Sequence, residues 1–487
     1  MIISVILIPF ITGFLVPVIP FRKRWQKEVF LETAVVVNSL LVWYLLLHHS
    51  DSTFLLAHFT GNLNISFRVD GMSMVFAGLV SALWPFATLY AFEYMTKEQH
   101  ENIFFLFYTL TYGVTLGIAF AANLLTMYFF YELLTLVTVP LVMHTLTREA
   151  VLASRKYLYY SLGGAAFAFI GLIMVIVYGT TTDFILGGVF DPARIAGHTN
   201  ILLLIYVMAF MGFGVKAAVC PFNSWLPQAG VAPTPVTALL HAVAVVKAGA
   251  FAIMRLTYYS FGTDFLRGTW AQTVVMIVVM FTIVYGCSRA VKETHIKRRL
   301  AYSTISNLSY ILFGAVLMTP LGLVGALTHL VFHALMKITS FFCAGAVMHQ
   351  TDRHYVHELD GFGYKMPCTF GIFTISALAL MGVPGLTGFV SKWNLAQAAV
   401  ASENPLAWGG IACLLVSALL TAIYMLTMVV RAFFPGKDFD YKTISDVKDP
   451  GWKMLLPLFV FTIFIIGFGL YSQPIVDFFM NVATGNV

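Results

Sequence analysis

The stretch GFGVKAAVCPFNSWLP, residues 212–227, places a lysine inside an apolar run and follows it with residues that break helices. A charge at mid-membrane costs about 2.5–3.5 kcal/mol on insertion scales, so Lys216 needs either a partner or a use. Pro221 and Pro227 lack the backbone donor that a continuous helix requires. The stretch therefore predicts a membrane span that is broken close to a buried charge.

The composition of the whole chain agrees with a membrane setting. Of its 487 residues, 59% are hydrophobic and 10% are charged, and the mean hydropathy is +0.85. Soluble domains carry about 25% charged residues. We therefore predict an all-α polytopic protein of the cell (inner) membrane. The net charge of +6 is explained by membrane topology rather than by nucleic-acid binding.

The cysteines and glycines give no sign of a cofactor. Iron–sulfur and zinc sites need clustered thiolates, whereas the five cysteines are scattered without C-x-x-C spacing. The sequence has neither a G-x-G-x-x-G strand–turn–helix motif nor a Walker A loop. We expect this chain to hold no cofactor, no metal and no catalytic centre of its own.

Apolar stretches of about 20 residues, the length of a helix that crosses a bilayer, recur along the chain. Between the second and third of them, residues 49–70 alternate in polarity around a turn-like Gly61-Asn62, which predicts a small extramembrane hairpin. The twelfth is too long for one plain span and contains Pro384 and Gly385. We predict about fourteen spans, with the seventh and twelfth broken, at 2–19, 29–48, 71–95, 103–121, 122–144, 156–179, 200–222, 233–256, 271–290, 299–318, 321–348, 368–400, 406–432 and 453–475.

The two broken segments indicate an internal repeat. A Met-Gly dipeptide precedes Lys216 and Trp225 in the first, and another precedes Lys392 and Trp393 in the second. Interrupted hydrophobic segments at corresponding places of two halves are typical of inverted-repeat transporters. The predicted units are helices 1–3 (1–102), two inverted five-helix repeats comprising helices 4–8 (103–256) and helices 9–13 (271–432), and a C-terminal helix 14 (453–487).

Basic residues are distributed unequally between the two sides of this topology. Of the 28 Lys and Arg residues, 20 fall in loops on one side and four on the other. The positive-inside rule places the basic loops in the cytoplasm and both termini outside. Among the acidic residues, only Glu132 lies deep inside a span. The four basic residues left inside predicted spans are Lys216, Lys247, Lys337 and Lys392.

Glu132 and Lys216 both lie in the first predicted repeat, and together they could control whether the lysine keeps or releases its proton. Burial favours the neutral form of a lysine, and a nearby carboxylate favours its charged form. A Glu132–Lys216 pair would therefore hold a proton when closed and release it more easily when open. The alternative for this pair is a static ion pair that joins two helices.

Two histidines and a lysine form a stripe in THLVFHALMKITSFF, residues 328–342. His329, His333 and Lys337 stand at i, i+4 and i+8, on approximately one helix face over about 12 Å. Histidine accepts and donates protons near neutral pH, so the stripe predicts a proton relay. His241 and His349, by contrast, are interpreted as structural hydrogen-bond donors.

The other two lysines inside predicted spans, Lys247 and Lys392, are also interpreted as functional. Lys247 lies near the middle of the span 233–256, and its small neighbours allow close helix packing. Lys392 follows the break at Pro384 and Gly385, where backbone groups freed from a helix could coordinate water.

Several long motifs, in order and at family spacing, resemble the antiporter-like subunits shared by respiratory complex I, membrane-bound hydrogenases and Mrp-type Na+/H+ antiporters. The chain stops soon after span 14, which suits the smaller branches: the D-type Mrp subunit and its hydrogenase or complex I counterparts. The resemblance covers spans 3–13 and rests on DGMS (70–73), FYELLTLVTVPLV (130–142), FNSWLPQAGVAPTPVTALLHAVAVVKAG (222–249), RRLAYSTISNLSY (298–310), LTHLVFHALMKITSFFCAGAV (327–347) and GVPGLTGFVSKW (382–393).

The resemblance implies fourteen helices, two inverted five-helix repeats and broken helices 7 and 12. Many members have Asp-x-His where Gln228 and Gly230 stand here, so a role of this loop in proton uptake or subunit coupling is not carried over. By motif, the family's proton-translocating positions match Glu132 in helix 5, Lys216 in helix 7, Lys247 in helix 8, His329, His333 and Lys337 in helix 11, and Lys392 in helix 12.

We expect a proton- or sodium-translocating subunit of a multisubunit redox-driven complex, either complex I-like or of the membrane-bound hydrogenase type. Protons would pass from Lys216 or Lys247 through His333 and Lys337 to Lys392. The alternatives are a D-type subunit of an Mrp-type Na+/H+ antiporter without a redox partner, and a non-conducting structural subunit. Expected partners are homologous antiporter-like and small membrane subunits and, in a redox complex, peripheral iron–sulfur, nickel or flavin subunits.

Overall fold

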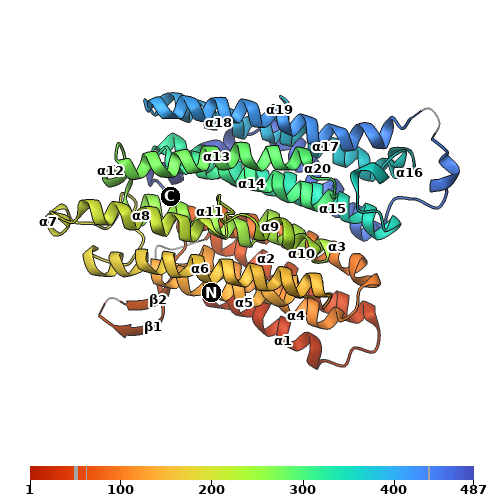
Figure 1. Ribbon diagram of the computed structural model, residues 1–487. Helices are drawn as coiled ribbons and strands as arrows, with labels where there is room; N and C mark the ends of the chain where they lie inside the picture. Colours follow the sequence, from red (N-terminus) through yellow and green to blue (C-terminus); the bar gives the residue numbers. More distant parts are fainter. Residues whose placement is uncertain (49–52, 62, 437–438) are drawn as a thin grey trace.

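The computed structural model describes residues 1–48, 53–61, 63–436 and 439–487. Its long helices run side by side, with α7 (Pro192–Ile195), α12 (Thr263–Leu266) and α16 (Phe362–Lys365) and many of the loops at the two ends of the bundle (Figure 1). Ten of the described helices are long and apolar enough to cross a membrane, and three shorter apolar helices accompany them. A helical, multi-span membrane protein is therefore confirmed, whereas the fourteen spans and the two inverted repeats stay predictions.

The N-terminal part contains long helices and one small sheet. Strand β1 (Phe54–Thr60) pairs antiparallel with β2 (Leu63–Phe67), so a hairpin is present within the predicted region. Residues 49–52, at the start of that region, and Asn62, in its expected turn, lie outside the described residues. The helices are α1 (Ile2–Val18), α2 (Arg24–Leu47), α3 (Gly71–Tyr94), α4 (Glu101–Ala119), α5 (Leu124–Val142) and α6 (Arg148–Tyr178).

The middle of the chain is less regular than the rest. Two π-helical segments, 239–243 and 256–261, flank α11, so the span predicted at 233–256 is one interior rod of mixed helix types. Extra-residue turns of this kind are frequent at functional sites. The helices here are α7 (Pro192–Ile195), α8 (Thr199–Gly214), α9 (Trp225–Gln228), α10 (Thr234–Ala238), α11 (Val245–Arg255) and α12 (Thr263–Leu266).

The C-terminal part returns to long helices. The span predicted at 368–400 is two helices, α17 and α18, separated by residues 382–386. Gly382 and Gly385 adopt φ values of +94° and +87°, which L-residues with side chains rarely adopt, and Pro384 lies between them. The helices are α13 (Trp270–Lys292), α14 (Ile296–Val316), α15 (Pro320–Thr351), α16 (Phe362–Lys365), α17 (Pro367–Met381), α18 (Thr387–Ala401), α19 (Pro405–Phe433), α20 (Trp452–Leu470) and α21 (Gln473–Thr484).

Two helical rods form the interior. The apolar windows of α15 and of the rod at 234–261 are completely buried, whereas only 33% of the corresponding window of α20 is buried. A rod covered on all sides belongs in the middle of a bundle. These two rods carry Lys247, His329, His333 and Lys337, so the fold encloses most of the predicted site.

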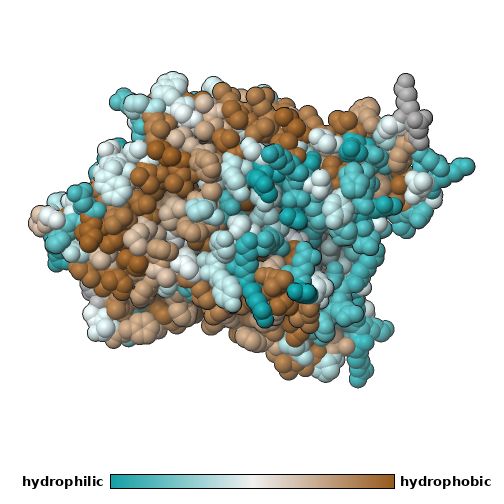
Figure 2. Space-filling view, in the orientation of Figure 1, coloured by the Kyte–Doolittle hydropathy of each residue, from teal (hydrophilic) through white to brown (hydrophobic). Residues whose placement is uncertain are grey.

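Polar surface is concentrated at one end of the molecule. Hydrophilic residues gather most densely around α16, while hydrophobic residues cover much of the surface between the two ends of the molecule (Figures 1 and 2). The polar end carries many of the basic residues that the sequence assigned to cytoplasmic loops, including Lys97 and Arg353. This asymmetry agrees with the charge distribution predicted from the sequence.

One basic residue that the sequence assigned to an outer loop lies inside the protein. Arg255, at the end of α11, is fully buried and makes two hydrogen bonds to Asp70, of 2.8 and 2.6 Å. Its guanidinium lies over the rings of Phe184 and Tyr259 at 4.8 and 4.7 Å. Burial would raise the pKa of Asp70, but Arg255 outweighs it and holds that pKa below its usual value. The pair fixes the start of α3 to the end of α11.

We predict that Arg255→Ala destabilises the protein by about 1.5–3 kcal/mol, because Asp70 loses its charge-assisted hydrogen bonds to Arg255 and keeps only Arg68, at 3.5 Å, as a charged partner among the described residues. Thermal unfolding of the detergent-purified protein measures the effect. The matched control is Arg353→Ala, whose partner Glu358 is 3.8 Å away at the surface, and which should cost less than about 1 kcal/mol. Equal shifts for the two variants would contradict this role of the Asp70–Arg255 pair.

Candidate functional site

The chain unwinds immediately before Lys216. Helix α8 ends at Gly214, and the next helix begins at Trp225, so residues 215–224 are not helical. The Val219 amide donates to the Gly214 carbonyl at 2.9 Å, and the Trp225 indole donates to the Val215 carbonyl at 2.8 Å. These bonds supply partners for part of the backbone that the break releases. The predicted break of the seventh span thus begins at Gly214, ahead of Pro221.

Lys216 and Glu132 lie against each other across two helices. The Lys216 ammonium is 3.6 Å from a carboxylate oxygen of Glu132. It also donates a hydrogen bond to the Tyr131 carbonyl and lies 3.3 Å from the centre of the Tyr131 ring. The Lys216 side chain is 1% exposed and that of Glu132 is 23% exposed. The structure therefore brings together the two residues whose pairing the sequence suggested.

The unwound segment passes very close to α11. A Cβ atom added at Gly249 would lie 2.5 Å from the Ala217 amide nitrogen and 3.1 Å from Cβ of Lys216. Only glycine permits this approach of one backbone to another. Since Gly249 stands two residues after Lys247, the contact fixes the positions of two buried lysines relative to each other.

Lys247 makes direct contact with the histidine stripe. Its ammonium group is 2.6 Å from Nδ1 of His333, and both side chains are completely buried. The rings of His333 and His329 stack with their centres 5.6 Å apart. Nδ1 of His329 is in turn 2.9 Å from the Ser391 hydroxyl, on α18. A line of hydrogen-bonding groups therefore runs from Lys247 on α11, through α15, to the residue preceding Lys392.

Lys337, the third member of the predicted stripe, donates its hydrogen bonds to a different helix from those to which the two histidines are hydrogen-bonded. Its ammonium donates to the Leu300 carbonyl at 3.2 Å and to the Ser303 hydroxyl at 2.7 Å, both on α14. Ser303 is also 2.6 Å from the Tyr424 hydroxyl of α19. The spacing in sequence indicates a common face of α15, whereas the structure shows that its members contact α11, α18 and α14 separately.

Lys392 occupies the break between α17 and α18. Its ammonium donates to the carbonyls of Leu380 and Met381 at 2.7 and 2.8 Å, the last two residues of α17. These carbonyls have no partner within the helix, and a cation near a helix C-terminus is stabilised further by the helix dipole. The carbonyls at the end of α17 are thus bonded to the lysine, and water at the break itself stays a prediction.

His241 is not the structural hydrogen-bond donor expected from the sequence. Its imidazole is completely buried in the first π-helical segment, and neither ring nitrogen has a hydrogen-bond partner among the described residues. Its ring lies 4.8 Å from that of Phe341 on α15. A buried polar group without a hydrogen-bond partner costs free energy. Such unpaired groups are typical of functional positions. Its sequence signal is weak, since a single histidine in an apolar run does not reveal its partners.

Within the described ranges, no three His, Cys, Asp or Glu side chains lie close enough together to hold a metal ion. The site instead contains ammonium and imidazole groups, one carboxylate and several hydroxyls. Amines and imidazoles each accept and release one proton at nitrogen. The arrangement therefore provides successive positions for a proton inside the bundle.

Known proteins share both the sequence pattern and the fold. A family model described as NADH:quinone oxidoreductase/Mrp antiporter, TM, matches residues 121–431, more than half of the chain. A second, NADH-Ubiquinone oxidoreductase (complex I), chain 5 N-terminus, matches residues 57–105. The N subunit of the NADH-quinone oxidoreductase of Desulforudis audaxviator is 29% identical over 427 residues, which cover 85% of this chain and 83% of that protein.

Two further relatives come from other complexes. A Na(+)/H(+) antiporter subunit of Alkalihalophilus pseudofirmus is 28% identical over 505 residues, 96% of this chain but only 60% of that longer protein. A chain of the membrane-bound sulfane sulfur reductase, an archaeal respiratory membrane complex, superposes with a TM-score of 0.84 at 22% identity, covering 99% of this chain and 97% of the other. At that identity the structural match establishes the fold alone.

We predict that Gly249→Ala destabilises the protein by about 1–3 kcal/mol, because the added methyl group overpacks the contact with the 216–217 backbone. Gly163→Ala on α6 is the matched control, since a Cβ atom there meets nothing within 4 Å. That variant should stay neutral or gain up to about 1 kcal/mol from helix propensity. Thermal unfolding in detergent compares them, and equal behaviour of the two variants would argue against the close contact.

Proposed function

The chain belongs to the NADH:quinone oxidoreductase/Mrp antiporter transmembrane family, and on that basis we propose that it translocates protons as one subunit of a multisubunit membrane complex. The observation that carries this proposal is the set of contacts Lys247–His333–His329–Ser391. Charges are costly inside a membrane protein, and buried ionisable groups there mark ion pathways. A purely structural helix contact would need fewer of them.

The proposed route follows these contacts. A proton on Lys247 passes to Nδ1 of His333, which is 2.6 Å away, and then to the adjacent imidazole of His329. From there the Ser391 hydroxyl leads to Lys392 at the break of α17 and α18. Lys337, four residues after His333 on the same helix, feeds protons into the route at that histidine. When one of these side chains becomes protonated, its positive charge repels a proton on the adjacent side chain and so favours transfer to the next one.

The Glu132–Lys216 pair is the proposed control point. When the pair is closed, the carboxylate stabilises the charge of Lys216; when it opens, that stabilisation is lost and the proton is released more easily. The close contact at Gly249 places Lys216 beside α11, the helix that carries Lys247. A change in the charge of Lys216 therefore acts electrostatically on Lys247, where the route starts. The 23% exposed side chain of Glu132 gives a neighbouring protein electrostatic access to the pair.

Two kinds of complex suit this role. One is redox-driven, of the complex I-like or membrane-bound hydrogenase type, with iron–sulfur, nickel or flavin subunits at its periphery. The other is an Mrp-type Na+/H+ antiporter, in which no redox subunit takes part and sodium is the second ion. The proteins that purify with the chain distinguish the two. In both, the neighbours in the membrane would be homologous antiporter-like and small membrane subunits.

We predict that Lys216→Ala and Glu132→Gln each reduce ion pumping by the reconstituted complex by about tenfold or more, in the range typical of lost acid–base groups. Proton uptake into vesicles measures this, with subunit composition checked on the same samples. Arg155→Gln, a change at an exposed basic residue of α6, serves as the control and should pump normally. Undiminished pumping by Lys216→Ala would reject the control point and favour a non-conducting scaffold.

We further propose that both termini face outward and that the basic loops face the cytoplasm. In a background without the native cysteines, Asp264→Cys should react with a membrane-impermeant thiol reagent added to intact cells, while Lys448→Cys should react only after permeabilisation. Both positions are exposed in the structure. The positive-inside distribution of Lys and Arg is the reason for this orientation, and the opposite labelling pattern would reverse it.

A further inference from the structure

Lys297 is buried although its sequence surroundings are those of a basic loop. It lies in HIKRR, at the start of α14, and is 6% exposed. Its ammonium donates to the Ala232 carbonyl at 2.9 Å, in the turn that leads into α10. The next residue, Arg298, is 49% exposed and pairs with Glu293 at the surface. Two adjacent basic residues therefore have opposite environments, and only one of them serves as a surface charge.

The buried lysine points toward the proton-carrying part of the bundle. Leu300 and Ser303, which accept hydrogen bonds from Lys337, follow Lys297 on α14 by three and six residues. At 1.5 Å per residue these positions are about 4.5 and 9 Å further along the helix. Lys297 and the two groups that bind Lys337 thus lie within two turns of one another on α14.

A polar pocket lies on the outer side of Lys297. It has a volume of about 520 Å³ and is lined by Tyr94, Lys97, Glu98, His349 and Asp352, among others. Lys97 and Asp352 are exposed, so this pocket faces the polar end of the molecule. Burial raises the pKa of Glu98, and the charge of Lys297 opposes that rise. The field of the buried lysine therefore reaches a carboxyl group of the pocket.

Two hydroxyl groups connect this pocket to the segment that holds Lys297. The Thr234 hydroxyl donates to the Tyr94 hydroxyl at 3.2 Å. Thr234 stands two residues after Ala232, whose carbonyl accepts the hydrogen bond of Lys297. Hydroxyl groups both donate and accept, so they suit a path between pocket water and the buried amine.

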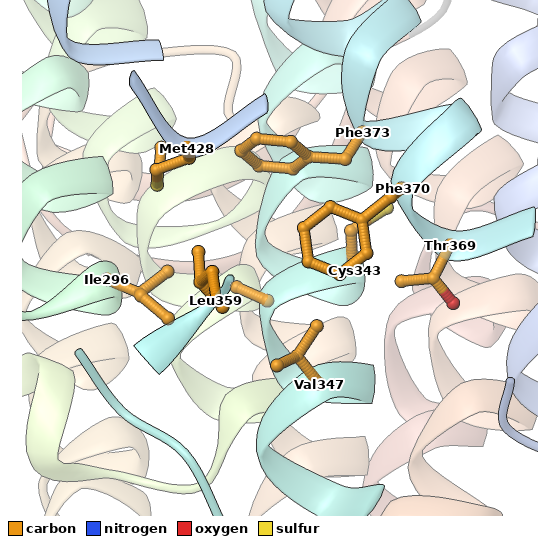
Figure 3. Close-up of a pocket in the computed structure, with 9 residues that line it drawn as sticks. Ile296, Cys343, Val347, Leu359, Thr369, Phe370, Phe373 and Met428 are labelled. Atoms are coloured by element: carbon orange, nitrogen blue, oxygen red, sulfur yellow. The ribbon is translucent and has the colours of Figure 1, made fainter. Parts of the chain in front are cut away.

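The opposite side of the same region is closed by apolar side chains. Figure 3 shows Cys343, Val347, Phe370 and Phe373 around a space that also touches Ile296, the neighbour of Lys297. This cavity measures about 10 Å³, at the lower limit of what one water molecule needs. Of the two spaces, the polar pocket is the one that can hold several water molecules, and it is linked through Tyr94 and Thr234 to the segment that holds Lys297.

We propose that Lys297 is the residue that takes up protons from the 520 Å³ pocket and passes them to Lys337. This role rests on the proposed function and adds the uptake branch to it. A hydrated proton binds the neutral amine of Lys297 and forms its ammonium. The ammonium then gives that proton to the neutral amine of Lys337, so Lys297 returns to neutrality and one positive charge has moved into the bundle.

Replacing Lys297 by arginine distinguishes a proton-transferring role of this residue from a purely structural one. Lys297→Arg keeps a positive hydrogen-bond donor for the Ala232 carbonyl, but a guanidinium does not release its proton in proteins. Lys297→Gln keeps a neutral donor and carries no proton. The complex with each variant is reconstituted into vesicles, and proton uptake and subunit composition are measured. Arg298→Gln is the matched control on the neighbouring residue, and Lys337→Gln marks the loss of the central route.

We expect both Lys297 variants to assemble and to lower proton uptake by about tenfold or more, while Arg298→Gln remains within about twofold of the unmodified complex, since exposed pairs contribute little. Full uptake by Lys297→Arg or Lys297→Gln, together with loss in Lys337→Gln, would overturn the uptake role and leave the proposed function intact. Full uptake by the Lys297, Lys337 and Lys216→Ala variants alike would overturn both.

Discussion

An ammonium group inside a membrane protein must meet lone pairs, because water is excluded there and an unpartnered charge is very costly. Three of the buried lysines meet the requirement with backbone carbonyls, Lys216 with Tyr131, Lys297 with Ala232 and Lys337 with Leu300. The half-buried Lys392 does the same with Leu380 and Met381. A carbonyl oxygen holds a cation in place but does not take its proton at ordinary pH. Lys247 differs, because the hydrogen bond described for it is to an imidazole. The interior thus combines ammonium groups held by carbonyls with contacts to imidazole and hydroxyl groups, of which Lys247–His333 is the shortest.

The irregular parts of the fold follow from the same constraint. A continuous helix uses most of its carbonyls for its own amides, whereas the end of a helix leaves carbonyls free for other donors. The interruption between α17 and α18 exposes such acceptors to Lys392. The unwound residues after Gly214 allow Lys216 to lie against α5 and α11 at once. Helix breaks in this chain are therefore places where a charge is accommodated.

The sequence predicts the parts of this arrangement that depend on composition and spacing. Glu132 and Lys216 stand out because topology leaves few charges inside the spans, and the structure brings them within 3.6 Å. What the sequence does not reveal is set by packing between distant segments. The burial of Lys297 depends on the turn at Ala232, and that of Arg255 on Asp70. From local composition alone, both Lys297 and Arg255 would be placed at the membrane surface. Nothing nearby in the sequence identifies Ala232 or Asp70, the partners with which they are buried.

The exposure of the Glu132–Lys216 pair is uneven, with 23% for the carboxylate side chain and 1% for the ammonium side chain. A charge carried by an adjacent protein therefore acts on the carboxylate from outside, while the amine remains in the dry interior. In a low-dielectric medium such an influence weakens only slowly with distance. In the proposed complex, energy would then pass between neighbouring subunits as an electric field, without a chain segment entering the bundle.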